Sequence, residues 1–109
     1  MKTMTINIAE EFSDAPGARY IDDGPDSGEL FYQKVLKPKF KSALELHTDL
    51  IVDMDGTFGY ATSFISESFG NLSKDFGALK VLEVLKIKSD EDSEIKLFTI
   101  KTIENPNSK

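Results

Sequence analysis

Two adjacent hydroxyl side chains, Thr62 and Ser63, stand where the sequence predicts the start of a helix. Apolar residues follow them at the spacing of one helix face: Ile65, Phe69, Leu72 and Phe76. A phosphate on a hydroxyl at a helix N-terminus is stabilised by the free backbone N–H groups, and it adds about −1.5 to −2 charge to the surface. The same hydroxyl can also act only as an N-cap, which is worth about 1 kcal/mol. The residues leave both roles open.

Two carboxylates form a second candidate for chemistry. Asp53 and Asp55 follow an apolar run, and the stretch from Leu50 to Phe58 resembles the first motif of haloacid-dehalogenase-type phosphatases, Asp-x-Asp-Gly-Thr. That resemblance implies a nucleophilic Asp53, a general acid and base at Asp55, and Mg²⁺ at the strand end. The rest of such a site would have to follow the motif, and the remaining chain is too short to supply it. The alternative is that both aspartates flank a strand end, with Gly56 in a turn that needs positive φ.

Composition excludes several classes of function. A chain of 109 residues is long enough for one domain, and its net charge of −6 is the opposite of a nucleic-acid-binding footprint. The absence of cysteine excludes disulfides, thiolate metal sites and a thiol nucleophile, and the single histidine, His47, excludes a zinc site with several imidazole ligands. We expect no metal, no cofactor and no catalytic residue. The start lacks the apolar region of a signal peptide and no stretch could span a membrane, so we expect a cytoplasmic protein.

Patterns along the chain predict an alternation of strands and helices. Strands are expected over Thr3–Ile8, Leu50–Val52 and Val81–Ile87, with a brief extended segment at Arg19–Ile21. Helices are expected from Asp26 or Ser27 to Lys37, from Pro38 to about Glu45, from Thr62 or Ser63 to about Lys74, and over Ile95–Ile103. For the last of these, the acidic run Ser89–Glu94 favours a helix over a strand.

This order of elements indicates a small α/β fold. We expect a mixed sheet of about four strands with helices packed on it, in a single domain covering 1–109. Its core is predicted over about 3–104, and the polar residues 105–109 are expected to form a flexible tail.

Two longer motifs carry a resemblance that covers most of the chain. They are Pro16–Arg19 followed by Asp23–Phe31, and then Asp53–Leu72. Together they resemble the STAS-like domains of unknown function and, more distantly, the STAS domains of bacterial anti-sigma factor antagonists. The resemblance implies a small, non-enzymatic, regulatory α/β protein whose partner is a GHKL-type ATPase kinase.

The antagonist pattern also implies a phosphorylation site. In those proteins a strand-end Asp leads to Asp-Ser-Ser-Gly at the next helix, and the first Ser is phosphorylated. The resemblance places Asp53 on the strand-end Asp, Thr62 on the phosphorylated Ser and Ser63 on its neighbour. Two positions depart from the pattern, because Ala61 replaces the Asp before the hydroxyls and Phe64 replaces the Gly.

Further side chains in the motifs are candidates for partner binding: Arg19, Ser27, Glu29, Tyr60, Phe64 and Glu67. Their alternative roles are structural, with Ser27 capping a helix, Arg19 paired with Glu29 or Asp26, and Glu67 facing solvent. Our leading hypothesis is a protein-interaction module that binds through Gly59–Glu67. The alternatives are the phosphatase and a sensor of a nucleotide or another anion, held by Arg19, Ser27 and the helix end at Ser63.

Overall fold

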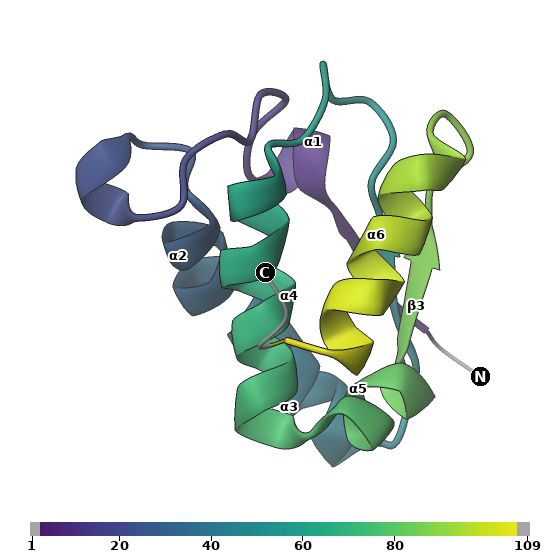
Figure 1. Cartoon of the computed structure of the whole chain (residues 1–109). Helices are drawn as coiled ribbons and strands as arrows, with labels where there is room; N and C mark the ends of the chain where they lie inside the picture. Colours follow the sequence, from purple (N-terminus) through teal and green to yellow (C-terminus); the bar gives the residue numbers. More distant parts are fainter. Residues whose placement is uncertain (1–2, 107–109) are drawn as a thin grey trace.

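The computed structural model describes residues 3–106, and Figure 1 shows their arrangement. The strands are β1 (Met4–Asn7), β2 (Leu50–Asp53) and β3 (Leu85–Lys88). The α-helices are α1 (Ile8–Glu11), α2 (Gly28–Phe31), α3 (Lys37–Leu46), α4 (Thr62–Phe76), α5 (Ala78–Val84) and α6 (Ser93–Glu104). A 3₁₀ turn, η1 (Ile21–Asp23), and a π-helical segment, η2 (Tyr32–Leu36), complete the order.

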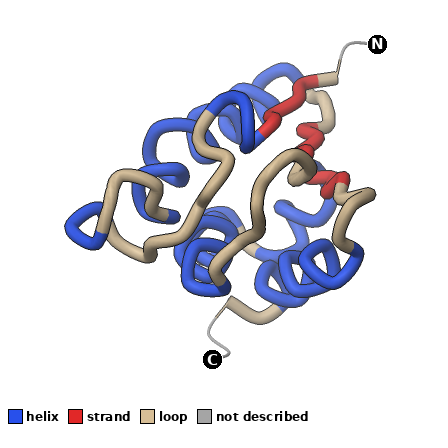
Figure 2. The backbone as a smooth tube through the Cα atoms, turned by 90° about the horizontal axis from the view of Figure 1, so that it is seen from above, coloured by secondary structure: helices blue, strands red, loops and turns tan. Residues whose placement is uncertain are grey.

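The three strands form a parallel sheet in the order β1-β2-β3, and they lie side by side near one margin of the molecule in Figure 2. Side chains on one face of the sheet are buried beneath the helices: Ile6, Leu50, Val52, Leu85 and Ile87. The alternate residues Thr5, Lys86 and Lys88 are exposed, as the twofold repeat of a strand requires. The sheet is therefore covered on one face, and its carboxyl ends all point to the same edge.

The expected mixed sheet of about four strands is corrected to three parallel strands within residues 3–106. The predicted extended segment Arg19–Ile21 is shorter than expected, because Tyr20 has extended backbone angles and Ile21 already begins the 3₁₀ turn η1. In the predicted strand Val81–Ile87, the first half belongs to α5, where Val81 donates its N–H to the carbonyl of Gly77 at 3.0 Å. A continuous apolar run suits a buried strand and a buried helix equally well, so its pattern cannot place this boundary.

The predicted helices all occur, with small shifts at their ends. Ser27 is the N-cap of α2, as expected, and its Oγ accepts the N–H of Leu30 at 3.1 Å. Pro38 does not interrupt the helical path, because the π-helical turn η2 lies directly before it. A wider turn accommodates the carbonyl that the proline ring would otherwise strike and the missing N–H.

One apolar cluster joins the sheet to the helices, and the centre of it is aromatic. Phe31 of α2 lies 5.4 Å from Phe64 and 6.3 Å from Phe69 of α4, measured between ring centroids. Such tilted aromatic pairs add to the stabilisation from burial. At the C-terminal end Asn105 donates its N–H to Lys101 at 2.9 Å, and the remainder of the predicted tail, 107–109, lies outside the described residues. Between Thr3 and Pro106, no helix has the length and apolar character needed to cross a membrane.

Candidate functional site

Residues 54–61, which we call the β2–α4 loop, leave the carboxyl end of β2 and project beyond the helices at the top of Figure 1. Backbone bonds to the N-terminal segment hold the loop, since Phe58 donates its N–H to Asp14 at 2.8 Å and Ala61 donates to Pro16 at 3.3 Å. The side chain of Phe58 is 90% exposed. A held backbone with an exposed aromatic ring is typical of a recognition loop rather than of a buried turn.

The carboxylate of Asp55 ties this loop to the segment after β3. It accepts the backbone N–H groups of Glu91 at 2.9 Å and Asp90 at 3.1 Å, and it accepts Nζ of Lys88 at 2.9 Å. The bond from the Glu91 backbone, followed by the bond from Lys88, holds the pKa of Asp55 below its ordinary value. The same contacts with Asp55 hold the pKa of Lys88 above its ordinary value. Asp55 therefore acts as a clamp between two loops.

Asp53 is engaged in the same place. Its Oδ1 accepts the N–H of Asp55 at 3.0 Å and lies 3.8 Å from Nζ of Lys88. Glycine at position 56 adopts a φ of 95°, as the turn interpretation of this motif requires, and donates its N–H to the carboxylate of Glu91 at 2.8 Å. Within residues 3–106, no group of three or more His, Cys, Asp or Glu side chains is placed to hold a metal ion.

Helix α4 begins without a side-chain cap. Its N-cap residue is Ala61, and Thr62 and Ser63 are the first two helical residues, so the expectation that one of these hydroxyls caps the helix is wrong. Ala61 has extended backbone angles and donates its N–H to the carbonyl of Pro16, so the helix begins one residue later, at Thr62. Thr62 is exposed and Ser63 is half-buried. The more accessible hydroxyl thus stands at an uncapped, positively polarised helix end.

The first sequence motif packs the start of α2 against α4. Gly28 donates its N–H to Ala18 at 2.8 Å, and Glu29 donates to the carbonyl of Arg19 at 3.0 Å. A Cβ on Gly28 would lie 2.4 Å from the carbonyl oxygen of Phe64, so the two helices approach each other only because this residue is glycine. The carboxylate of Glu29 accepts the N–H of Ile21 at 2.8 Å. Gly28 and Glu29 therefore hold the backbone of the segment from Ala18 to Ile21 in place, and Glu29 does so partly through its side chain.

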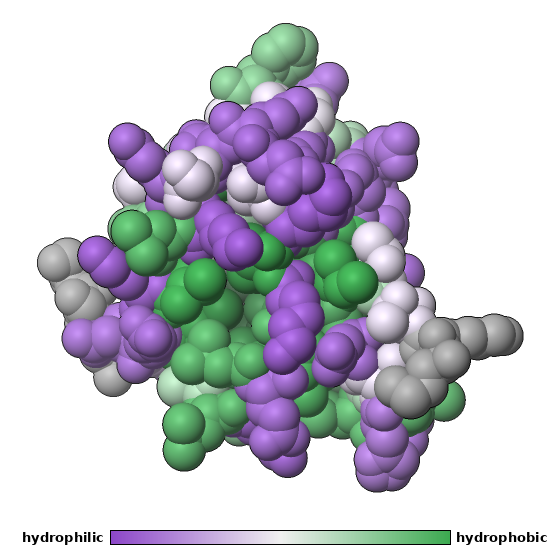
Figure 3. Space-filling model, turned by 90° about the vertical axis from the view of Figure 1, so that its right-hand side faces the viewer, coloured by the Kyte–Doolittle hydropathy of each residue, from purple (hydrophilic) through white to green (hydrophobic). Residues whose placement is uncertain are grey.

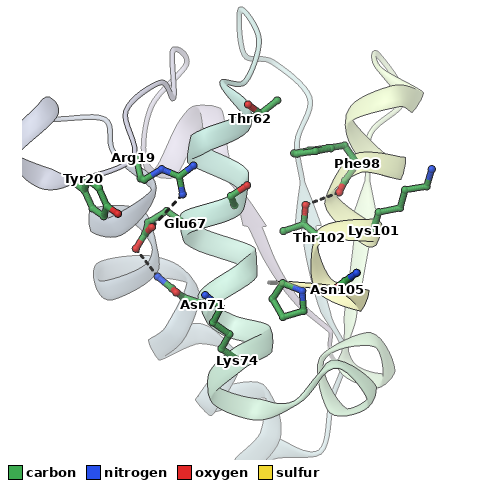
Figure 4. A pocket seen from close by; sticks show the side chains of 12 residues that line it. Arg19, Tyr20, Thr62, Glu67, Asn71, Lys74, Phe98, Lys101, Thr102 and Asn105 are labelled. Atoms are coloured by element: carbon green, nitrogen blue, oxygen red, sulfur yellow. Dashed lines mark hydrogen bonds and ion pairs between the residues drawn. The ribbon is translucent and has the colours of Figure 1, made fainter. Parts of the chain in front are cut away.

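The structural alternative expected Arg19 to pair with Glu29 or Asp26, and this is wrong. Arg19 pairs instead with Glu67 of α4, at 3.5 Å. Glu67 also accepts Nδ2 of Asn71 at 2.8 Å, and the close-up in Figure 4 shows these three side chains turned toward one another. The motif backbone is fixed beside α2, which leaves the long Arg19 side chain free to reach across to α4. The expectation that Glu67 only faces solvent is also corrected, because its side chain is 17% exposed.

Arg19 and Glu67 line a groove of about 750 Å³ between α4 and α6, which we call the α4–α6 groove. Thr62 lines the same groove, and Phe98 extends into it from α6 (Figure 4). The sequence offered no signal for the α6 side of this groove, because α5 and β3 separate α6 from α4 in the chain and only the tertiary fold brings the two helices together.

The candidate residues differ in location and in accessibility. Arg19, Thr62 and Glu67 lie together in the α4–α6 groove. Ser27 and Phe64 have no exposed surface, so any effect that they have on binding is exerted through the position of α2 and α4. Tyr60 is half-buried, with its hydroxyl donated to the carbonyl of Met54 at 2.8 Å, and burial raises the pKa of its phenol.

Sequence reasoning missed Phe58, which lies one residue before the predicted binding segment Gly59–Glu67. A signal was available, because this aromatic residue stands in a turn with Gly56 and Gly59 on either side. No buried helix or strand was predicted there to absorb its side chain. An aromatic residue in such a turn is expected at the surface, where it is available for contact with a partner.

A family model described as "STAS-like domain of unknown function (DUF4325)" matches residues 27–94, which is more than half of the chain. The matched range begins at the α2 cap and ends in the first turn of α6, so it contains the β2–α4 loop, α4 and β3. The searches of curated proteins and of solved structures found no match.

Proposed function

Since the chain belongs to the family of STAS-like domains of unknown function, we propose that it is a non-enzymatic regulatory module that binds a partner protein through the β2–α4 loop and the start of α4. The observation that carries this proposal is Phe58, an aromatic side chain that is 90% exposed on a hydrogen-bonded loop. The partner class implied by the resemblance is a GHKL-type ATPase kinase.

Phe58 supports the proposal because it places a large aromatic ring in solvent on a loop whose backbone is held by hydrogen bonds. Large aromatic side chains dominate binding energy at protein interfaces, and an anchor on a held loop loses little entropy when it binds. The first part of the loop is held by the contacts of Asp55, and the second part is held by backbone bonds to Asp14 and Pro16. The ring is thus already positioned before a partner arrives.

A phosphorylation switch at Thr62 is the regulatory part of the proposal. Thr62 is exposed and lies four residues after Phe58, at a helix N-terminus that no side chain caps. A phosphate there gains from the free N–H groups of the helix and is tolerated in the free protein. In the complex it would lie beside the Phe58 contact, where two added negative charges oppose docking of a partner. Ser63 is the less accessible acceptor of the two.

The phosphatase and the anion sensor are less well supported. Both oxygens of Asp55 are occupied by hydrogen-bond donors, so it is poorly placed to move protons in a reaction. For the sensor, Ser27 is buried and its Oγ is used by the cap of α2, so it cannot share an anion with Arg19.

An affinity capture from the native host, read by mass spectrometry, tests the proposal. The baits are the wild type, Phe58→Ser, and the control Leu46→Ser, which removes an exposed apolar residue at the end of α3. We expect an ATPase or kinase to be retained by the wild type and by the control and lost by Phe58→Ser. Retention of the same protein by all three baits would contradict the assigned surface.

The switch has its own pair of baits. Thr62→Glu adds a charge at the helix start, and Thr62→Gln has nearly the same shape without the charge. We expect the partner to be released by the glutamate variant and kept by the glutamine variant, and we expect phosphate on Thr62 in the wild-type protein. Equal retention by both variants would remove the switch from the proposal and leave the binding module.

A further inference from the structure

The outer edge of β3 forms a second surface, on a different side of the molecule from the β2–α4 loop. Because the strand order is β1-β2-β3, β3 is an edge strand, and its outer side pairs with no other strand within residues 3–106. The carbonyl of Lys88 accepts the N–H of Met54, so the peptide groups of Lys88 face the sheet. Alternation then places the N–H and C=O of Ile87 on the outer edge.

An apolar groove of about 260 Å³ adjoins this edge. Its apolar lining comes from α5, β3 and α6: Leu82, Leu85, Ile87, Ile100 and Ile103. Leu79 precedes Leu82 by three residues and Leu97 precedes Ile100 by three, so helix geometry continues the apolar surface outward from the groove. Leu79 is 86% exposed and Leu97 is 53% exposed. Figure 3 shows apolar side chains gathered on this side of the molecule, with hydrophilic side chains crossing them.

The charged residues that line the groove are both lysines. Its lining contains Lys86 and Lys96 and no acidic residue, although the whole chain carries −6. Nζ of Lys86 donates to the backbone carbonyl of Glu83. Because this acceptor is neutral, the bond does not neutralise the positive charge of Lys86. An occupant of this surface is therefore expected to carry acidic side chains next to its apolar ones.

The same lysines argue against a second copy of this chain as the occupant. Antiparallel pairing of β3 with β3 of another copy would keep the helices on one face and the lysines on the other. Lys86 would then lie opposite Lys86 or Lys88 of its neighbour, and like charges directly opposite each other destabilise a strand pair. Lysines on an edge strand are a common protection against self-association.

We propose that the edge of β3 and its apolar groove accept an extended segment of a partner protein as a fourth strand, in which apolar residues alternate with acidic ones. The outward N–H and C=O of Ile87 supply the backbone pairing, the apolar positions of the segment fill the groove, and its acidic positions meet Lys86. This surface is independent of the Phe58 surface, so the protein can hold one partner at each.

A displayed library of random ten-residue peptides, selected on the full chain, tests this surface. The edge variant is Lys86→Glu with Lys96→Glu, and the matched control is Lys34→Glu with Lys41→Glu, which changes the net charge equally at exposed residues of η2 and α3. We expect selected peptides that alternate apolar and acidic residues. Their affinity should fall roughly tenfold on the edge variant and stay unchanged on the control. Hydrogen exchange at the Ile87 amide should slow when the peptide binds.

Three results would overturn the inference. One is a selection that enriches no peptide of this pattern, and another is binding that survives the edge variant. The third is a dimer in sedimentation experiments whose formation protects the Ile87 amide from hydrogen exchange, because a second copy would then occupy the edge. Loss of binding on the edge variant while Phe58→Ser still binds would separate this surface from the proposed partner site.

Discussion

Asp55 and Lys88 meet at 2.9 Å across the carboxyl ends of β2 and β3, although they stand 33 positions apart in the chain. Two backbone N–H groups from the segment after β3 complete the shell of Asp55. The motif that resembles a phosphatase nucleophile loop is thereby used to join two loops, and the loop that it steadies carries Phe58.

The Asp55 clamp predicts a particular dependence of stability on pH. The pKa of Asp55 in the folded state lies below the ordinary value of 3.8, so its stabilisation is complete above that value and is lost as the pH falls through the folded pKa. Asp55→Asn should lower the urea midpoint at neutral pH and make the acid loss of stability below pH 3.8 shallower than in the wild type. Parallel wild-type and variant curves of unfolding free energy against pH would show that the clamp does not stabilise the fold.

The close approach of α2 and α4 predicts that Gly28→Ala is destabilising. The added methyl would lie 2.4 Å from the Phe64 carbonyl oxygen, and the backbone must move to admit it. We expect a loss of about 1–3 kcal/mol in urea unfolding. Gly17→Ala is the control, because its nearest contact would be Ala15 at 3.7 Å, and this variant should stay within about 0.5 kcal/mol of the wild type. Similar losses for both variants would show that the loss at Gly28 does not come from the close contact with Phe64.

Helix capping predicts that the free energy of unfolding depends on the hydroxyl of Ser27 but not on that of Thr62. Ser27→Ala removes the acceptor of the Leu30 N–H and should lower the free energy of unfolding by about 1 kcal/mol. Thr62→Ala should change it by less than about 0.5 kcal/mol, since Thr62 caps nothing. Chemical denaturation of the two variants measures the difference. A larger loss for Thr62→Ala would mean that its hydroxyl takes over the cap in solution.

Engagement of both aspartates predicts that the protein does not hydrolyse phosphate esters. With Mg²⁺ and a generic aryl phosphate ester, phosphate release should equal the buffer blank, and Asp53→Asn should give the same result. Turnover above the blank that the Asp53→Asn substitution abolishes would instead establish Asp53 as a nucleophile and restore the phosphatase hypothesis.

Local patterns in the sequence were sufficient for the elements whose ends are marked by their own residues. The apolar run before Asp53 predicted β2, the spacing from Ile65 to Phe76 predicted α4, and Ser27 was identified as the cap of α2. The acidic run before α6 indicated its helical state in the same way, with Asp92 as the observed cap. These features depend on neighbours within four residues, so they can be recognised without the fold.

Tertiary structure alone decided the features that depend on distant partners. Whether Val81–Val84 became helix or strand depended on which neighbours would bury them, because the residues suit either state. Ala61 is the N-cap of α4, and its N–H is bonded to Pro16, which is distant in the sequence. Arg19 pairs with Glu67 because the close approach of α2 and α4 at Gly28 brings the two side chains together. The open edge of β3 likewise depends on the strand order, which segments far apart in the sequence decide together.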